Sequence, residues 1–259
     1  MIEKISSGIW KVGGGSWTGV ASVCSDENDC NVYLIATGGS VLLIDSGSRA
    51  GRPLIEENIR QTGFQPEQIT DLLLSHSHYD HTETALEWQS LYDPGIHMSA
   101  VAAEYLDKGD HRLVGYQIVG PEYAFELFRV DHSIEDGEIF NIGILDIEAY
   151  AMPGHTPDSM IFETNVEGQR VWICGDITFG KDTTGEFGCI GWLNMLWQSN
   201  LEVYRASLER MLDMVQPNFL LPGHGNIVSD EENIRQTVQA SLATVAELMD
   251  NPHRRHFGL

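Results

Sequence analysis

The chain has 259 residues, and 38 Asp and Glu residues against 15 Lys and Arg residues give it a formal net charge of −23. A surface this acidic repels phosphate backbones, so we expect no nucleic acid among its partners. Apolar residues make up 42% of the chain, as is usual for a packed globular protein. No apolar run reaches the length of roughly 18 residues that a membrane-spanning helix needs. We therefore expect no membrane span, and the first residues lack the apolar core of a signal peptide.

The four cysteines, at positions 24, 30, 174 and 189, form no C-x-x-C pair. Cys24 and Cys30 flank a polar loop, where a disulfide is one alternative and two reduced thiols are the other. We favour reduced thiols and a cytoplasmic location, since disulfides are rare in the cytosol. Cys174 lies in an apolar run and is predicted to be a core residue.

The first third of the chain predicts strands followed by helices. Strand-like runs cover residues 8–12, 30–37 and 40–47, and the Gly-Gly pair at 38–39 predicts a hairpin turn between the last two. A helix is expected over residues 52–62, a short buried strand over 69–77 and a second helix over 82–92.

Three strand-like runs follow in the second half, at residues 144–156, 159–165 and 170–176, and a fourth run with its loop covers 217–226. Ser199 and Ser229 are each followed by a glutamate three residues later, the pattern of a capping box, and apolar residues recur at helical spacing behind each serine. Strands and helices thus alternate in two halves. This order predicts sheets covered by helices in a single domain over residues 1–259.

The stretch "SHSHYDH", residues 75–81, places three histidines and an aspartate directly after an apolar strand. Alternation along an extended chain directs His76, His78 and Asp80 to one side, and His81 begins the next helix. Imidazole nitrogens and carboxylate oxygens bind divalent zinc, iron or manganese. Four such ligands exceed what one tetrahedral ion with an open position needs, so the cluster predicts two ions side by side.

Further ligand candidates follow other apolar strands. "PGHT" contains His155, "CGD" contains Asp176, "PGHG" contains His224 and "LLIDSG" contains Asp45. Each polar residue lies beside or close to a glycine, which allows the tight turn that directs a ligand inward. One histidine alone is more often a core or surface residue, but four strand ends together with the cluster favour a metal centre.

In this set of motifs, in this order from Val32 to Asn226, the chain resembles the metallo-β-lactamase superfamily. The resemblance implies an α+β fold, a four-layer αββα sandwich. It also implies that His76, His78 and His155 hold one metal ion and that Asp80, His81 and His224 hold the other. Asp176 would bridge the two ions, and Asp45 would orient the ligand imidazoles. The cofactors implied are two divalent metal ions, with zinc favoured and iron or manganese as alternatives.

Within that family the complete ligand set resembles the hydroxyacylglutathione hydrolases and lactonases. His78 is not a glutamate, which disfavours the flavodiiron branch, and Asp176 stands where some true β-lactamases have cysteine. Acyl-homoserine lactonases usually carry a tyrosine shortly after the bridging aspartate, where this chain has Phe179. The chemistry is therefore better indicated than the substrate.

The ligand set predicts hydrolysis by a hydroxide that bridges two metal ions, because bound zinc lowers the pKa of water to about 7. Asp176 and Asp80 are the predicted catalytic carboxylates. Asp176 would set the spacing of the metals, and Asp80 would also accept or donate a proton as the tetrahedral intermediate collapses. The predicted substrate is a neutral, partly apolar lactone, ester or thioester.

The apolar segment over residues 181–200 is the first candidate for a substrate pocket. Phe179, Trp192 and Trp197 are its predicted contacts, and packing against the last helices or a homodimer interface is the alternative. We expect the two tryptophans to be covered, because exposing a large apolar side chain costs roughly 1.5–3 kcal/mol. The region 105–140, which includes Phe128, is the second candidate for a pocket wall or for an oligomer surface.

Three other activities compete with this prediction. Persulfide dioxygenases of the same superfamily use one iron held by residues that match His76, His155 and Asp176. Hydrolysis of β-lactams is a second alternative, as a main or side activity. A nuclease is a third, which the acidic charge disfavours. The alternative to any activity is a non-catalytic metal-binding module, and the complete ligand set with an open water position argues against it.

Overall fold

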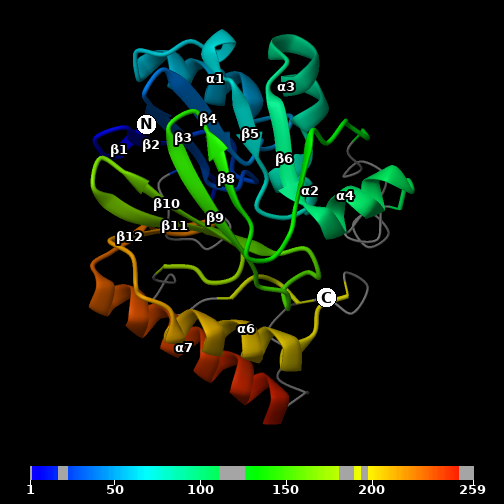
Figure 1. Cartoon of the computed structure of the whole chain (residues 1–259), viewed down its shortest axis with the longest axis vertical. Helices are drawn as coiled ribbons and strands as arrows, with labels where there is room; N and C mark the ends of the chain where they lie inside the picture. The colour runs from blue at the N-terminus through cyan, green and yellow to red at the C-terminus, as the bar shows by residue number, and fades with distance from the viewer. Residues whose placement is uncertain (1, 17–22, 111–125, 181–189, 194–197, 251–259) are drawn as a thin grey trace.

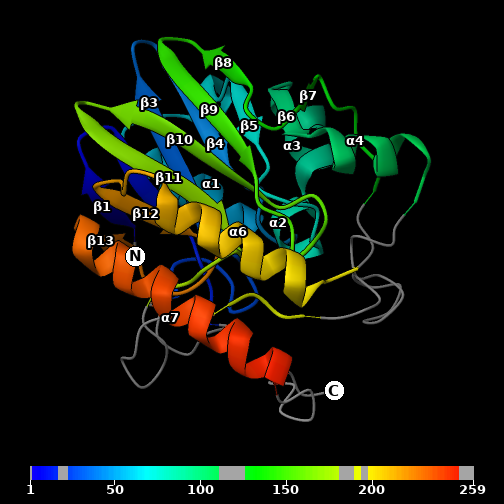
Figure 2. The same cartoon turned by 60° about the horizontal axis from the view of Figure 1, so that its bottom comes forward.

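A computed structural model describes residues 2–16, 23–110, 126–180, 190–193 and 198–250, and its two β-sheets face one another between layers of helices (Figure 1). Helices α1, α3 and α4 cover the outer face of the first sheet. Helices α6 and α7 lie side by side on the outer face of the second sheet, as Figure 2 also shows. The structure therefore confirms the predicted αββα sandwich.

The first sheet contains seven strands in sequence order, β1(Glu3–Ser6), β2(Ile9–Gly13), β3(Val32–Thr37), β4(Ser40–Ile44), β5(Asp71–Leu73), β6(Gly95–Ser99) and β7(His132–Ile134). Strands β1 to β4 are antiparallel, and β4 to β7 are parallel. The predicted hairpin turn is confirmed, since Thr37 pairs with Ser40 and both intervening glycines have positive φ.

The second sheet contains six strands in the order β13-β12-β11-β10-β9-β8, with bounds β8(Ile139–Ile142), β9(Leu145–Ala151), β10(Met160–Val166), β11(Gln169–Gly175), β12(Phe219–Pro222) and β13(Val228–Ser229). Only β11 and β12 are parallel neighbours. Because β10 is antiparallel to both β9 and β11, the strands β9, β11 and β12 all run in one direction.

The helices are α1(Arg52–Gln61), α2(Tyr79–Thr82), α3(Ala85–Tyr92), α4(Ala100–Asp107), α6(Leu201–Asp213) and α7(Glu231–Asp250), with a 3₁₀ turn at Pro66–Gln68. The helix expected over 82–92 is confirmed as α3, which begins at Ala85, and a short break separates it from the preceding helix α2. The buried Thr84 hydroxyl donates to the Ser46 carbonyl at the break, which anchors this part of the chain to the end of β4. No helix in the described part of the chain is long and apolar enough to cross a membrane.

Strand alternation divides the apolar residues between separate cores. Leu43 faces the core beneath α1, α3 and α4, whereas its neighbours Leu42 and Ile44 face the core between the two sheets. A third core lies between the second sheet and α6 and α7, where Trp172 and Tyr204 are fully buried. Successive side chains of a strand point to opposite faces, so a central strand of this sandwich must be apolar on both.

The helix caps differ from the sequence prediction. Asn200, not Ser199, caps α6, and its side chain accepts a hydrogen bond from the Val203 amide. Ser199 instead donates to the carbonyl of His155 over 2.6 Å. At α7 the Asp230 carboxylate accepts from the amides of Glu232 and Asn233, so Ser229 is not the cap. Both serines stand one residue before another good capping residue, and the motif alone does not choose between them.

Replacing Asp230 with alanine is expected to lower the free energy of unfolding by at least about 1 kcal/mol, because α7 loses its N-terminal cap. Asp230 also has a φ of 81°, which alanine adopts at a further cost. Asp230→Asn should retain most of the stability, and Ser229→Ala should change it by less than about 0.5 kcal/mol. Urea unfolding of the three variants measures the difference, and a larger loss in Ser229→Ala would restore the serine as the cap.

Candidate metal centre

The predicted ligands meet at one edge of the sandwich because their strands end there. Asp45 follows β4 and the 75–81 loop follows β5, and these two strands are parallel neighbours in the first sheet. His155, Asp176 and His224 follow β9, β11 and β12 of the second sheet, which share one direction. Contacts between the sheets close this edge, including the bond from the Met160 amide to the Ser75 carbonyl.

All seven predicted metal ligands lie in this place, and all are at least 93% buried. Their candidate ligand atoms fall within 4.8 Å of one another in two groups, namely His76, His78, His155 and Asp176, and Asp80, His81 and His224. These are the two groups that the family resemblance implies. That each group holds a metal ion stays a prediction.

The Asp176 carboxylate contacts both groups. Its Oδ2 lies 3.6 Å from Nε2 of His155 and 3.5 Å from Nε2 of His224. Its Oδ1 lies 3.3 Å from Nε2 of His81. Asp80 belongs to one group only, with Oδ2 3.0 Å from Nε2 of His224. Asp176 therefore has the position that a bridging carboxylate requires.

Burial sets the charge of the imidazoles in the first group. It lowers the pKa of His76 and His78 well below the ordinary histidine value, and it lowers that of His155 to about 4. A neutral imidazole keeps a lone pair for a metal ion. Burial raises the pKa of Asp176, but His224 and His81 outweigh it and hold the carboxyl well below its ordinary range, so it is an anion.

The donor set fits divalent cations. Nε2 of His81 and Oδ1 of Asp176 are buried without a hydrogen-bond partner among the described residues, although they face each other. Leaving such polar atoms unsatisfied is costly, and a cation between them would remove the cost. Five imidazoles and two carboxylates are a ligand set that zinc, iron or manganese accepts.

Asp45 lies where the resemblance implies, behind the ligands. Its Oδ2 is 2.7 Å from Nδ1 of His81, so this imidazole turns its Nε2 toward Asp80 and Asp176. Asp45 has a φ of 58°, an uncommon conformation outside glycine that often marks functional sites.

Of the predicted pocket residues, two lie in the described part of the chain. Phe179 is buried, and its ring stands edge-on to His224 at 5.4 Å between centroids, so it packs against a candidate ligand. Trp192 is 44% exposed, so the fold alone does not provide the covering that we expected. Trp197 and most of the 181–200 segment lie outside the described residues.

The neighbouring turn brings Trp192 close to the candidate ligands. The amide of Gly191 donates to the carbonyl of Asp176 over 3.0 Å. A Cβ atom on Gly191 would lie 2.5 Å from that carbonyl oxygen and 2.5 Å from Nδ1 of His155. The turn therefore rests directly on His155, and only glycine fits there.

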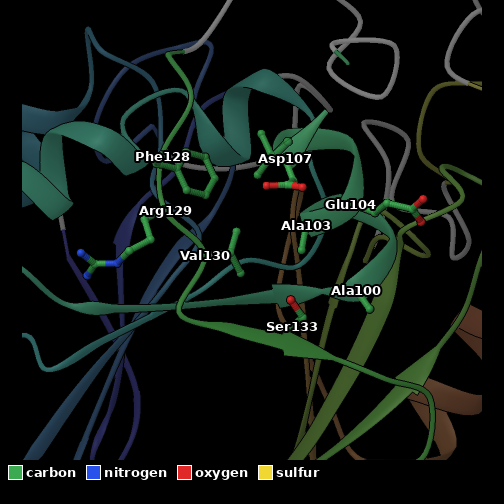
Figure 3. A pocket seen from close by; sticks show the side chains of 9 residues that line it. Ala100, Ala103, Glu104, Asp107, Phe128, Arg129, Val130 and Ser133 are labelled. Carbon is green, nitrogen blue, oxygen red and sulfur yellow. The ribbon is translucent and has the colours of Figure 1, made fainter. Parts of the chain in front are cut away.

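Phe128, from the second candidate wall, lines a separate pocket of about 590 Å³ between α4 and residues 128–133 (Figure 3). None of the seven candidate ligands lines this pocket. The prediction that this region forms a wall of the metal site is therefore not supported for Phe128.

Sequence reasoning missed three buried residues beside the cluster. Ser75 contacts Asp45 and His76, and Cys30 lies within ligand distance of Asp45 and His81. Asp158 is 1% exposed. Burial raises the pKa of its carboxyl, although hydrogen bonds from Thr156 and Ser77 act to lower it. Ser75 and Asp158 adjoin the motifs, which was a usable signal, whereas nothing in the sequence placed Cys30 near His81.

A four-layer sandwich with a histidine and aspartate cluster at its strand ends defines a metal-binding hydrolase fold. Residues 25–224 match the metallo-beta-lactamase superfamily, and the chain belongs to that family. Membership implies binding of a divalent metal ion.

Three curated relatives show what the chain is similar to. An atrochrysone carboxyl ACP thioesterase of Aspergillus fumigatus is 28% identical over 82% of this chain and 55% of its own length. A lactamase-like protein of another Aspergillus is 24% identical over 93% and 62%. A beta-lactamase-like protein 2 homolog of Drosophila melanogaster is 26% identical over 77% and 60%. The chain thus spans less than two thirds of the length of each.

Two solved structures share the fold. A metallo-β-lactamase of Cronobacter sakazakii superposes with a TM-score of 0.75 at 20% identity, covering 98% of this chain and 99% of its own. The metallo-β-lactamase of Legionella gormanii gives a TM-score of 0.74 at 18% identity, with coverage of 98% and 97%. At these identities the likeness concerns the fold.

Gly191→Ala is expected to displace His155 and to reduce metal binding by the first group, because the new Cβ would overlap the imidazole. Gly95→Ala is a matched control, since the nearest atom to its Cβ would be 3.5 Å away. Elemental analysis of both purified variants measures the effect. Wild-type metal content in Gly191→Ala would contradict the tight contact.

Asp176→Ala is expected to reduce metal content in both groups, because its carboxylate contacts histidines of each. His224→Ala should reduce mainly the second group. Metal-to-protein ratios after dialysis distinguish the two patterns, and an Asp176→Ala variant that keeps its full metal content would remove the bridging role.

Proposed function

We propose that this chain is a metal-dependent hydrolase that cleaves a lactone, ester or thioester of a neutral, partly apolar substrate with the help of two divalent metal ions. The observation that carries the proposal is the position of Asp176, whose carboxylate lies within 3.9 Å of histidines from both ligand groups. Zinc is the metal we favour, because zinc accepts this mixture of imidazole and carboxylate.

When bound, such a metal pair lowers the pKa of water and polarises the scissile carbonyl. The chain's own contribution is to hold the ligands rigidly. His76, His78 and His155 would bind one ion, and Asp80, His81 and His224 the other. Each set comes from both sheets, so packing between the sheets fixes the spacing of the two ions.

Asp80 is our candidate for proton transfer. Burial raises its pKa, but His81 and His224 outweigh burial and lower it, so the carboxylate is ionised. Its place beside both of these histidines, rather than its pKa, makes it the candidate for moving a proton at the metal centre. Neither Cys30 nor Cys174 competes as a nucleophile, because both are fully buried and burial raises the pKa of both thiols.

The preference for a neutral, apolar substrate has two supports. The net charge of −23 opposes anions, and the exposed Trp192 lies beside His155 through the Gly191 turn. The thioesterase name of one relative supports an acyl thioester as one candidate substrate. We propose no nucleic acid or membrane partner, and a homodimer is one way in which Trp192 would be covered.

We also propose a cytoplasmic location. Cys24, Cys30 and Cys174 are free thiols in the structure, and free buried thiols suit a reducing compartment.

Two alternatives have specific support. Hydrolysis of β-lactams has the support of the solved structures, which are metallo-β-lactamases of the same fold. A mononuclear-iron persulfide dioxygenase has the support of the group that joins His76, His155 and Asp176.

The proposal is tested by metal analysis of purified protein together with a panel of a lactone, an acyl thioester, a β-lactam and a phosphodiester. Two zinc ions per chain with turnover of the lactone or thioester is the expected result. One tightly held iron with oxygen uptake would replace the hydrolase by the dioxygenase, and turnover of the β-lactam alone would select the lactamase.

Asp80→Asn is expected to lower kcat by about 10²–10⁴-fold, the usual worth of a proton-transfer group, while the fold is kept. Circular dichroism and metal content measured beside kcat separate catalysis from binding. Full activity with full metal content would mean that Asp80 moves no proton.

Trp192→Ala is expected to raise KM for long apolar substrates and to leave short ones nearly unchanged, because the exposed indole would contact the distal acyl part. Ile139→Ala is the control, since Ile139 is a 65% exposed apolar residue on β8. An equal change in KM for all chain lengths would assign Trp192 to the scaffold or to a subunit contact.

A further inference from the structure

Ser75, the residue before the histidine cluster, lies at the centre of a buried hydrogen-bond network. It is 1% exposed, its amide donates to Oδ1 of Asp45 over 2.8 Å, and its Oγ lies 2.9 Å from Oδ2 of the same carboxylate. The same Oγ is 3.1 Å from Nδ1 of His76. Ser75 therefore connects Asp45 to a histidine that Asp45 does not contact directly.

The donors and acceptors in this network admit one arrangement. A carboxylate only accepts, so the single hydroxyl hydrogen of Ser75 must point to Asp45. The Oγ lone pairs are then left for His76, which must carry its hydrogen on Nδ1. If His76 instead accepted from the hydroxyl, Oγ and the carboxylate would face each other over 2.9 Å with no hydrogen between them.

This arrangement directs the other nitrogen of His76 into the cluster. Its Nε2 lies 3.3 Å from Nε2 of His155 and 3.9 Å from Oδ2 of Asp176, and in the Nδ1–H tautomer it presents a lone pair there. Nδ1 of His81 is held by a shorter route, because it lies 2.7 Å from Oδ2 of Asp45 and must carry a hydrogen toward that carboxylate. One carboxylate thus orients a histidine in each candidate ligand group.

We infer that Ser75 is a positioning residue that relays the orienting effect of Asp45 to His76, so that one buried carboxylate prepares both metal sites. Oγ of Ser75 also lies 3.4 Å from Nδ1 of His81, but Asp45 holds that nitrogen at 2.7 Å. Loss of the hydroxyl would therefore free the tautomer of His76, whereas loss of the carboxylate would disturb His76 and His81 together. Partners of this kind typically change metal affinity by about 10–100-fold. The inference extends the proposed metal centre and rests on it only for the part that concerns metal affinity.

The first test uses metal-free protein and does not depend on the proposed function. Long-range proton–nitrogen correlation spectra of the histidine rings report which nitrogen carries the hydrogen. We expect Nδ1–H for both His76 and His81 in the wild type. In Ser75→Ala we expect a mixture of tautomers at His76 and no change at His81, and in Ser75→Thr the wild-type tautomer at His76. An Nε2–H tautomer of His76 in the wild type would overturn the inference.

The second test is zinc titration against a competing chelator. Ser75→Ala should weaken one of two binding steps by about 10–100-fold and leave the other at its wild-type value, and Ser75→Thr should restore the first. Asp45→Asn should weaken both. Thr164→Val is the control, because it removes a buried hydroxyl that bonds only the Asp146 carbonyl. Equal loss in both steps, or none, in Ser75→Ala would overturn the relay.

A Ser75→Ala variant that fails to fold would be replaced by Ser75→Cys, which keeps the shape but donates weakly. It is expected to behave as the alanine variant, and wild-type tautomers in it would count against the relay. A wild type that binds no zinc but shows the expected tautomers would refute the proposed metal centre and leave the orientation of His76 by Ser75 standing.

Discussion

The arrangement at the strand ends depends on burying two carboxylates next to each other. Asp80 and Asp176 are each 6% exposed, and like charges taken out of water in one place repel strongly. Among the described residues, the surrounding histidines offset that repulsion, with His224 in contact with both aspartates. A bound cation would neutralise the two carboxylates, so the arrangement fits a cation-binding site better than ordinary core packing. The sheets on either side must therefore be rigid enough to hold it.

That rigidity comes from strand direction and from the three cores. Because β4 and β5 are parallel in one sheet, and β9, β11 and β12 share a direction in the other, the turns that carry polar residues gather at one edge. Because the faces of both sheets pack against apolar cores, the polar ligand residues lie at the ends of the strands. Close packing at this edge explains why a glycine precedes His224, since a Cβ atom on Gly223 would overlap Oδ1 of Asp176 and Cε1 of His81.

Much of this was visible in the sequence, because ligand type and strand periodicity are local signals. The run of residues 75–81 and the three Gly-flanked motifs predicted the cluster. The alternation of strands and helices predicted sheets covered by helices, and the family resemblance implied the αββα sandwich. The wrong predictions arose where a local pattern allowed two choices and a tertiary contact decided between them. Ser199 and Asn200 are both good caps, and the choice between them came from the tertiary bond of Ser199 to His155. The break between α2 and α3 likewise came from a contact, that of Thr84 with Ser46.

Contacts between distant segments that no motif marks could not be predicted. Cys30 and His81 lie 51 positions apart in the sequence, and no periodicity links them. The exposure of Trp192 is similar, since apolar composition indicated burial but not which surface would provide it. The network around Asp45 shows why such contacts matter. The motif supplied the ligand atoms, but the direction of the His76 and His81 imidazoles depends on a hydrogen bond to the other ring nitrogen.

Charge and site geometry together restrict the substrate more than either does alone. A net charge of −23 lowers the local concentration of anions around the whole molecule, and the effect reaches about 8 Å from the surface at physiological ionic strength. A substrate carried on a phosphate-bearing group meets this field before it meets the cluster, whereas a neutral lactone or ester does not. Similarity to a thioesterase therefore favours a carrier-bound acyl thioester, whereas the acidic surface disfavours a substrate on a phosphate-bearing carrier. Under the proposed hydrolase function, the balance favours a free, uncharged substrate, with its apolar part at Trp192 and its carbonyl at the cluster.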